Sequence, residues 1–236
     1  SAASDVYKRQ VLPVLLLSSC MQRDALKVAD ECYADYVNPF IGTDFTGNTY
    51  PGAQVPFGMV QLSPDNGLPG WDRISGYFYP DSTIAGFSHT HLSGTGAGDL
   101  YDISFMPVTL PYKEAEEPLG IHSRFSHADE AASAGYYRVL LKDYDINVEL
   151  TATERCGIQR YTFPQADAAV ILNLRKAMNW DFTEDSYVEK VDSVTIQGYR
   201  FSDGWARGQR IFFRTRFSRP FETMRLDSAA VLKLSL

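Results

Sequence analysis

The stretch INVELTAT, residues 146–153, alternates apolar and polar side chains with a period of two. In a β-strand this spacing turns every second side chain toward the same face, so one face is buried and the other meets solvent. The same alternation covers 211–217, while 194–196 is a shorter version of it. The segment 136–141 combines aromatic and β-branched residues, and the apolar run 169–174 indicates a fully buried strand.

Around these strands, helical periodicity is weak, and only 113–117 and 129–133 could form a turn or two of helix. Short strands separated by Gly, Pro, Asn and Asp are typical of a sandwich or a barrel. The pattern is β almost throughout from residue 35 onward. We therefore predict an all-β fold, a large antiparallel β-sandwich with long functional loops.

Composition excludes several classes of protein. The 236 residues carry 22 Lys plus Arg against 29 Asp plus Glu, a net charge of −7, without any basic cluster. Binding to nucleic acid or to an anionic membrane surface needs patches of Lys and Arg, so both are excluded. No stretch reaches the roughly 20 apolar residues that span a bilayer. Aromatic residues make up 13% of the chain, which suits a sheet-rich protein and equally suits sugar binding.

The N-terminus reads as an export signal. Lys8 and Arg9 precede the apolar run 11–17, which is followed by two serines and Cys20. A basic segment, a short apolar segment and small residues form a secretory signal, and the Leu-Ser-Ser-Cys ending resembles the lipobox of bacterial lipoproteins, in which the cysteine is lipidated. The alternative is a short core helix with an unrelated cysteine. We assign 1–20 to the signal and 21–34 to a tether, and expect an exported lipoprotein of the bacterial periplasm, outer membrane or cell surface, anchored to the membrane through Cys20.

The remaining cysteines and the chain ends leave further expectations. Cys32 and Cys156 could form a disulfide after export or stay free, and no CxxC spacing predicts a metal site. The chain begins with Ser1 rather than Met, and 229–236 is an apolar stretch without a closing signal. We therefore expect a fragment of a longer protein.

The region 38–102 differs from the rest, because it is dense in Gly, Pro, His, Asp and aromatic residues. Loops of this kind often carry function, although long loops can also be inert. Within it, His89 and His91 are two residues apart and would share one face of a strand, as half of a metal site does. Hydrogen bonding within the loop or to a sugar is favoured, since no third ligand follows at metal spacing. The glycines of GTGAGD at 94–99 do not match a nucleotide-binding loop.

Tryptophans and acids in the chain suggest a sugar site. Trp71 lies beside Asp72, which together could offer a stacking face and a hydroxyl acceptor, or the tryptophan could cap the end of the sandwich. Trp180 and Trp205 lie beside Asp181 and Asp203 and look like edge or lid residues, with core packing favoured over a sugar contact. Glycoside hydrolysis needs two carboxyl groups flanking the bond. Six aspartates of the loop-rich region are available, although most are expected to form turns. They are Asp44, Asp65, Asp72, Asp81, Asp99 and Asp102.

Several segments resemble the N-terminal domain of glycoside hydrolase family 92. They are YVNPFIGT (36–43), NTYPGAQVPFGMVQLSPD (48–65), GWD (70–72), SGYFYPDSTIAGFSHTHLSGTG (75–96), GDLYDISFMP (98–107), TERCGIQRYTFP (153–164) and GWARGQRIFFRTRFSRPF (204–221). The resemblance runs from about Tyr36 to Phe221, and GFSHTHLSGTG is highly specific to the family. It assigns 35–236 to a supersandwich-like N-terminal domain.

The resemblance implies an exo-acting, inverting, calcium-dependent α-mannosidase that acts on N-glycans or mannan. Such enzymes join this sandwich to a C-terminal (α/α)6 barrel that supplies the acid, the base and the calcium ligands, so no catalytic residue or metal ligand is expected here, and this chain alone should be inactive. The sandwich lends the loops 43–50, 71–73 and 89–97 to one wall of the mannose pocket. The expected substrate-binding residues are Asp44, Asn48, Trp71, Asp72, His89, His91, Gly94, Thr95 and Gly96.

The sequence departs from the family pattern at 42–47, at Arg73 and Ile74, and at Ala97, which puts the linkage preference in doubt. Two other hypotheses stay open. The chain could be a complete, non-catalytic sugar-binding lipoprotein, which a stop codon directly after Leu236 would favour. It could also be a two-histidine metalloprotein, which the absence of stoichiometric transition metal from the purified chain would exclude.

Overall fold

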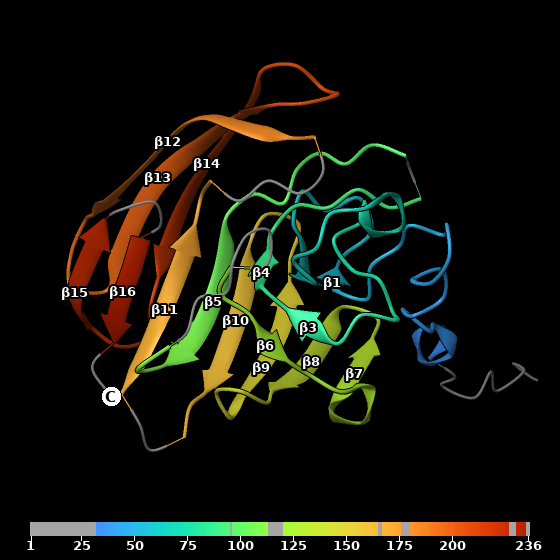
Figure 1. The fold of residues 1–236 in the computed structure, drawn as a ribbon, viewed down its shortest axis with the longest axis horizontal. Helices are drawn as coiled ribbons and strands as arrows, with labels where there is room; N and C mark the ends of the chain where they lie inside the picture. The colour runs from blue at the N-terminus through green and yellow to red at the C-terminus, as the bar shows by residue number, and fades with distance from the viewer. Residues whose placement is uncertain are drawn as a thin grey trace, which may run out of the picture. The chain divides into compact units, whose positions relative to one another are not determined.

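The computed structural model describes residues 32–94, 96–112, 120–164, 167–175, 180–226 and 230–234. The chain divides into two compact units, 1–33 and 34–236, and the strands belong to the second unit (Figure 1). The predicted signal, the lipidation site Cys20 and most of the tether lie outside the described residues.

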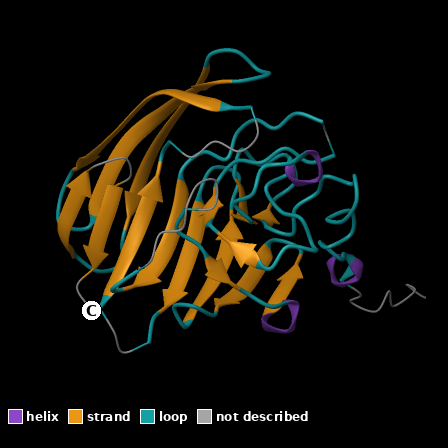
Figure 2. Cartoon of the chain, in the orientation of Figure 1, coloured by secondary structure: helices purple, strands orange, loops and turns teal. Residues whose placement is uncertain are grey.

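The described part consists almost entirely of strands and loops (Figure 2). Its helices are single 3₁₀ turns, η1 (Tyr33–Tyr36), η2 (Trp71–Arg73) and η3 (His127–Asp129). None of the helices in these described ranges could cross a membrane. The early strands are β1 (Ala53–Gln54), β2 (Gln61–Asp65), β3 (Thr83–Ile84), β4 (Gly86–Ser88), β5 (Ser104–Thr109), β6 (Ser123–Arg124), β7 (Glu130–Ser133) and β8 (Tyr136–Leu141). The later strands are β9 (Ile146–Ala152), β10 (Gly157–Thr162), β11 (Ala168–Asn173), β12 (Phe182–Lys190), β13 (Thr195–Asp203), β14 (Gln209–Arg216), β15 (Phe221–Leu226) and β16 (Ala230–Leu234).

These strands form antiparallel sheets. The largest has seven strands in the order β1-β2-β4-β5-β11-β16-β15. A four-stranded sheet has the order β10-β9-β8-β7, a three-stranded sheet the order β12-β13-β14, and β3 pairs with β6. The prediction of an all-β, antiparallel sandwich is therefore confirmed.

The centre of the seven-stranded sheet is buried on both faces. On one face Met106 of β5 and Ile171 of β11, which lie opposite each other, join a core with the inward side chains of β8 and β9. On the other face Phe105 and Leu172 join a second core with β12 and β13. Two covered faces explain why the sequence of β11 is a continuous apolar run instead of an alternating one.

The strand predictions at 136–141, 146–153, 169–174 and 211–217 are confirmed by β8, β9, β11 and β14, and that at 194–196 by the longer β13. The helical turn predicted at 129–133 is wrong, because after η3 the chain forms β7, whose Ala131 and Ala132 lie opposite Arg138 and Tyr137 of β8. The second predicted turn, 113–117, lies outside the described residues.

The glycine-rich region carries only short strands, and its long loops cover one end of the seven-stranded sheet (Figure 1). Several non-glycine residues there adopt the left-handed backbone conformation that side chains disfavour. They are Phe45, Asn48, Phe57, Leu100 and Tyr101, with Ile103 just beyond. Such backbone is retained where the surrounding contacts fix it.

Candidate functional site

Trp71 is presented by the short helix η2. Gly70, with φ of 152°, starts this turn, and its carbonyl accepts a hydrogen bond from the Arg73 amide at 3.0 Å. The Arg73 guanidinium donates to both carboxylate oxygens of Asp81 at 2.6 Å and lies 4.7 Å from the ring centre of Phe78. The contacts of Arg73 with Asp81 and Phe78 thus hold the turn in place, while Trp71 remains 59% exposed.

A second tryptophan stacks on the first. The rings of Trp71 and Trp180 lie 6.3 Å apart at 30°, and Trp180 is 41% exposed. The expected core packing of Trp180 and Trp205 is therefore wrong, since Trp205 is 77% exposed. Gly96 fits against the same stack, because a Cβ there would come within 3.1 Å of the Trp71 ring.

The loop around Asn48 is hydrogen-bonded to Gly94, two residues before Gly96 in the sequence. The Asn48 carbonyl accepts the Gly94 amide at 2.6 Å, and the Asn48 backbone is left-handed with φ of 51°. Its side-chain nitrogen donates to the Thr46 carbonyl at 3.3 Å, whereas its buried Oδ1 receives no hydrogen bond within the described ranges. Thr95, between the two glycines, lies outside the described residues.

Asp99 anchors the loop that carries Trp205. This buried carboxylate accepts the amides of Trp205 at 3.0 Å and Ala206 at 2.7 Å. Gly204 permits the approach, since a Cβ at that position would lie 2.5 Å from the Asp99 oxygen. The loop that follows β4 and the loop between β13 and β14 are therefore joined through one carboxylate.

A buried arginine links these segments. Arg200 of β13 donates to Asp102 and to Asp181, each at 2.6 Å, and all three side chains are inaccessible to solvent. Burial raises the pKa of the Asp181 carboxyl, an effect that Arg200 opposes, and the Asp181 Oδ1 has no hydrogen-bond partner among the described residues. Asp102 also accepts the Thr90 hydroxyl at 2.6 Å. The sequence prediction did not include Arg200, because its strand, TIQGYRFSD, mixes polar and apolar residues and does not mark the arginine as buried.

The two predicted histidines are held by the protein itself. His91 is 3% exposed, and its ring nitrogens lie 2.7 Å from the Gln61 carbonyl and 2.9 Å from Asp65. His89 lies 2.7 Å from the Ile103 carbonyl through Nδ1, and burial lowers its pKa to about 4, so the ring is neutral at pH 7. Their predicted contacts with a sugar stay predictions, because hydrogen bonds inside the fold already account for both rings.

Potential metal ligands do not gather in the described part of the chain. Within the residues that the structure describes, no three His, Cys, Asp or Glu side chains are close enough together to hold an ion. Cys32 and Cys156 are both free and exposed.

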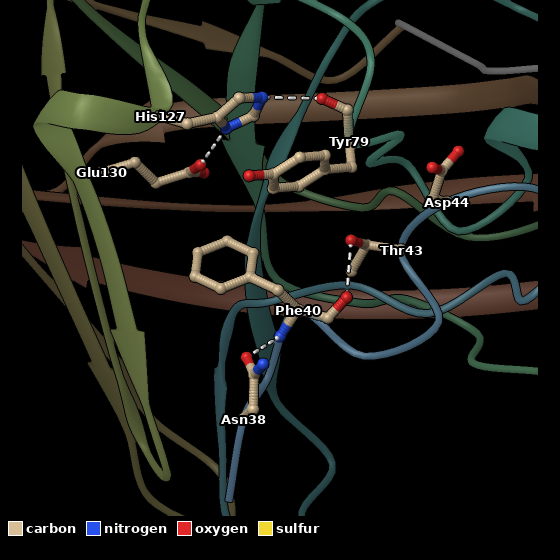
Figure 3. A pocket seen from close by; sticks show the side chains of 7 residues that line it. All are labelled: Asn38, Phe40, Thr43, Asp44, Tyr79, His127 and Glu130. Carbon is tan, nitrogen blue, oxygen red and sulfur yellow. Dashed lines mark hydrogen bonds and ion pairs between the residues drawn. The ribbon is translucent and has the colours of Figure 1, made fainter.

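The predicted acids Asp72 and Asp44 lie in different surroundings. Asp72 is partly exposed on η2, where its charge helps to raise the pKa of Arg73. Asp44 is exposed and lines a cavity of about 290 Å³ (Figure 3). The cavity walls are Asn38, Phe40, Thr43, Asp44, Tyr79, His127 and Glu130. Gly96 thus contacts Trp71 and Gly94 contacts Asn48, whereas Asp44 lines a separate cavity.

Comparison with known proteins gives a consistent result. Residues 36–232 match the family described as glycosyl hydrolase family 92 N-terminal domain. A family GH92 α-mannosidase from Bacteroides thetaiotaomicron, solved with mannoimidazole, is 38% identical with a TM-score of 0.78 over 86% of this chain and 30% of that one. An inverting family GH92 mannosidase from the same organism is 25% identical, with a TM-score of 0.66 over 86% of this chain and 29% of that one.

A curated relative, an uncharacterized secreted glycosidase of Arthroderma benhamiae, is 29% identical over 143 residues. The match covers 56% of this chain and 18% of the relative. This chain thus spans less than a third of the length of each protein to which it is compared.

Proposed function

Since the chain belongs to the glycosyl hydrolase family 92 N-terminal domains, we propose that it forms one wall of the sugar pocket of an exo-acting, inverting α-mannosidase. The substrate is the terminal α-mannose of N-glycan or mannan-type glycans. Similarity to an α-mannosidase solved with mannoimidazole and to an inverting mannosidase supports this assignment.

The observation that carries the proposal is the exposed stack of Trp71 and Trp180 against the glycine loop. The C–H face of a pyranose packs on an aromatic ring, and its hydroxyls need polar partners at the edge of that ring. Asp72, the next residue on η2, is partly exposed and can accept a sugar hydroxyl, and Gly96 lets the loop approach the ring closely. Pre-organised side chains of this kind lose little entropy when a sugar binds.

We place the chemistry outside these 236 residues. An inverting glycosidase needs an acid and a base about 6.5–9.5 Å apart. Asp65, Asp99 and Asp102 are buried and already hydrogen-bonded, and Asp81 pairs with Arg73. The acid, the base and the calcium ligands are assigned to a C-terminal (α/α)6 barrel of the same protein, consistent with the greater length of its relatives. Bound calcium would supply Lewis-acid stabilisation of charge in that barrel.

The experiment compares the 236-residue chain with a version extended by whatever its gene encodes after Leu236. Both are incubated with α-mannobiose and calcium, and the anomer released first is identified by NMR. We expect β-mannose from the extended protein only. Steady mannose release by the 236-residue chain would show that the catalytic groups lie within these residues and would contradict the proposal. Initial release of α-mannose would contradict inversion.

We further propose export and lipid attachment at Cys20, supported by the signal-like N-terminus and by the secreted relative. Growth with radiolabelled palmitate should label the wild-type protein but not a Cys20→Ser variant. Equal labelling of both proteins would overturn this assignment.

A further inference from the structure

The cavity beside Asp44 is formed by three segments that are distant in sequence. Asn38 to Asp44 form one side, Tyr79 the centre, and His127 with Glu130 the opposite side (Figure 3). The Tyr79 amide donates to the Thr43 carbonyl at 2.8 Å, so two of these walls are tied together. Trp71, Trp180 and Gly96 are not among the described residues that line this cavity.

The back of the cavity is rigid because of one buried carboxylate. The Glu130 side chain, 1% exposed, accepts hydrogen bonds from Tyr137 at 2.6 Å, from His127 Nδ1 at 2.7 Å and from Tyr77 at 3.0 Å. His127 uses its other nitrogen toward the Tyr79 carbonyl at 2.8 Å. Both ring nitrogens therefore lie within hydrogen-bonding distance of oxygen atoms, which fixes the orientation of the His127 ring.

This arrangement fixes an aromatic wall. The Tyr79 ring stacks on His127 with centres 3.9 Å apart and planes at 6°. Phe40 approaches Tyr79 edge-on at 6.0 Å and 73°. Tyr79 remains 39% exposed, so part of its ring is open to a ligand without any change of rotamer.

Polar groups with unused hydrogen-bonding positions line the same cavity. Asp44 uses Oδ1 to accept the Phe45 amide at 2.7 Å, and Asn38 uses Oδ1 to accept the Phe40 amide at 3.0 Å. Within the described ranges, no hydrogen bond involves Asp44 Oδ2, Asn38 Nδ2 or the Tyr79 hydroxyl. An acceptor, a donor and a hydroxyl beside an aromatic face suit a neutral polyhydroxylated ring. The charge of Asp44 disfavours an anionic ligand.

We propose that this cavity is a second, non-catalytic binding site for one neutral hexose unit of a glycan. Its volume of about 290 Å³ is at the lower end of the roughly 300–1,000 Å³ usual for small-molecule pockets, which fits one sugar ring better than an oligosaccharide. The choice of a mannose-containing glycan as the source of that hexose rests on the proposed function. The site holds a branch of the glycan while another branch occupies the pocket beside Trp71.

The test is an NMR titration of the 236-residue chain with methyl α-mannoside, following the backbone amides. We expect signals of the Asp44–Tyr79 cavity to shift with a dissociation constant on the order of 1 mM or weaker. Asp44→Ala and Asn38→Ala should each weaken that response at least fivefold and leave the signals beside Trp71 unchanged. Trp71→Ala is the matched control, because it should leave the cavity response intact.

Each outcome is informative. An absent cavity response in wild type, or a response that survives both cavity substitutions, overturns the second site. If the cavity responds while the signals beside Trp71 do not, even in the version extended beyond Leu236, the second site stands and the proposed sugar wall fails. Glucuronate should bind the cavity at least tenfold more weakly than the neutral mannoside, and equal binding would contradict the role given to Asp44.

Discussion

Replacing Arg200 by Met should destabilise the domain far more than any exposed charge substitution. The substitution retains an aliphatic side chain but leaves Asp102 and Asp181 buried without their cation. Breaking a buried ion pair from one side costs about 3–5 kcal/mol. At roughly 2–4 °C per kcal/mol for a domain of this size, the melting temperature should fall by roughly 6–20 °C. Urea unfolding followed by circular dichroism measures the free energy, and calorimetry measures the melting temperature.

The matched control is Arg207→Met. Arg207 also pairs with an aspartate, Asp203 at 2.8 Å, but it is 82% exposed, so the loss should be about 0–1 kcal/mol. Combining Arg200→Met with Asp102→Asn and Asp181→Asn should restore part of the lost stability, because two buried charges disappear. If Arg200→Met and Arg207→Met lowered the melting temperature equally, the buried network would not have the stabilising role assigned to it.

Three further predictions concern the loops. Because burial lowers the pKa of His89 from 6.5 to about 4, protonation favours the unfolded chain. Urea unfolding should show stability falling by about 3 kcal/mol between pH 7 and pH 4, and the His89→Gln variant should lose most of this dependence. Asp99→Ala removes the acceptor of the Trp205 and Ala206 amides and should cost about 1–3 kcal/mol in the same assay. Trp71→Ala should weaken the methyl α-mannoside response of the signals beside residue 71 about tenfold in an NMR titration of the extended protein, and Trp180→Phe should weaken it less than threefold, since an aromatic ring is retained.

The strands that the sequence predicts are those whose burial leaves a clear pattern of apolar residues in the sequence. β9 alternates because one face meets the core and the other meets solvent, and β11 does not alternate because both faces are covered. β12 escapes prediction, since most of its residues are polar and partly or fully exposed. The composition of 129–133 is compatible with a helix, but the segment forms strand β7 because it pairs with β8. The local sequence does not encode this pairing.

The aromatic site shows a similar division. Local composition was enough to predict Trp71, Gly94 and Gly96 as site residues. Ordering a glycine-rich loop costs conformational entropy and buries little apolar surface, so such a loop is a candidate for a functional role. Trp180 could not be predicted in this way, since it reaches Trp71 from a segment more than 100 residues away. Its local sequence, beside an aspartate and before a strand, is equally compatible with the core.

Some polar residues of the loop-rich region are exposed and can meet a ligand, while others are buried and serve the fold. The sequence does not encode which residues are buried. Asp99 and His91 look as suitable for ligand binding as Asp44, yet each is enclosed and its hydrogen bonds hold loops together. Left-handed backbone and tight glycine approaches make such loops unstable unless interior polar contacts fix them. A loop that must present Trp71 rigidly therefore needs many polar residues that never meet the ligand. The same composition that signals a binding site thus overstates the number of residues that line it.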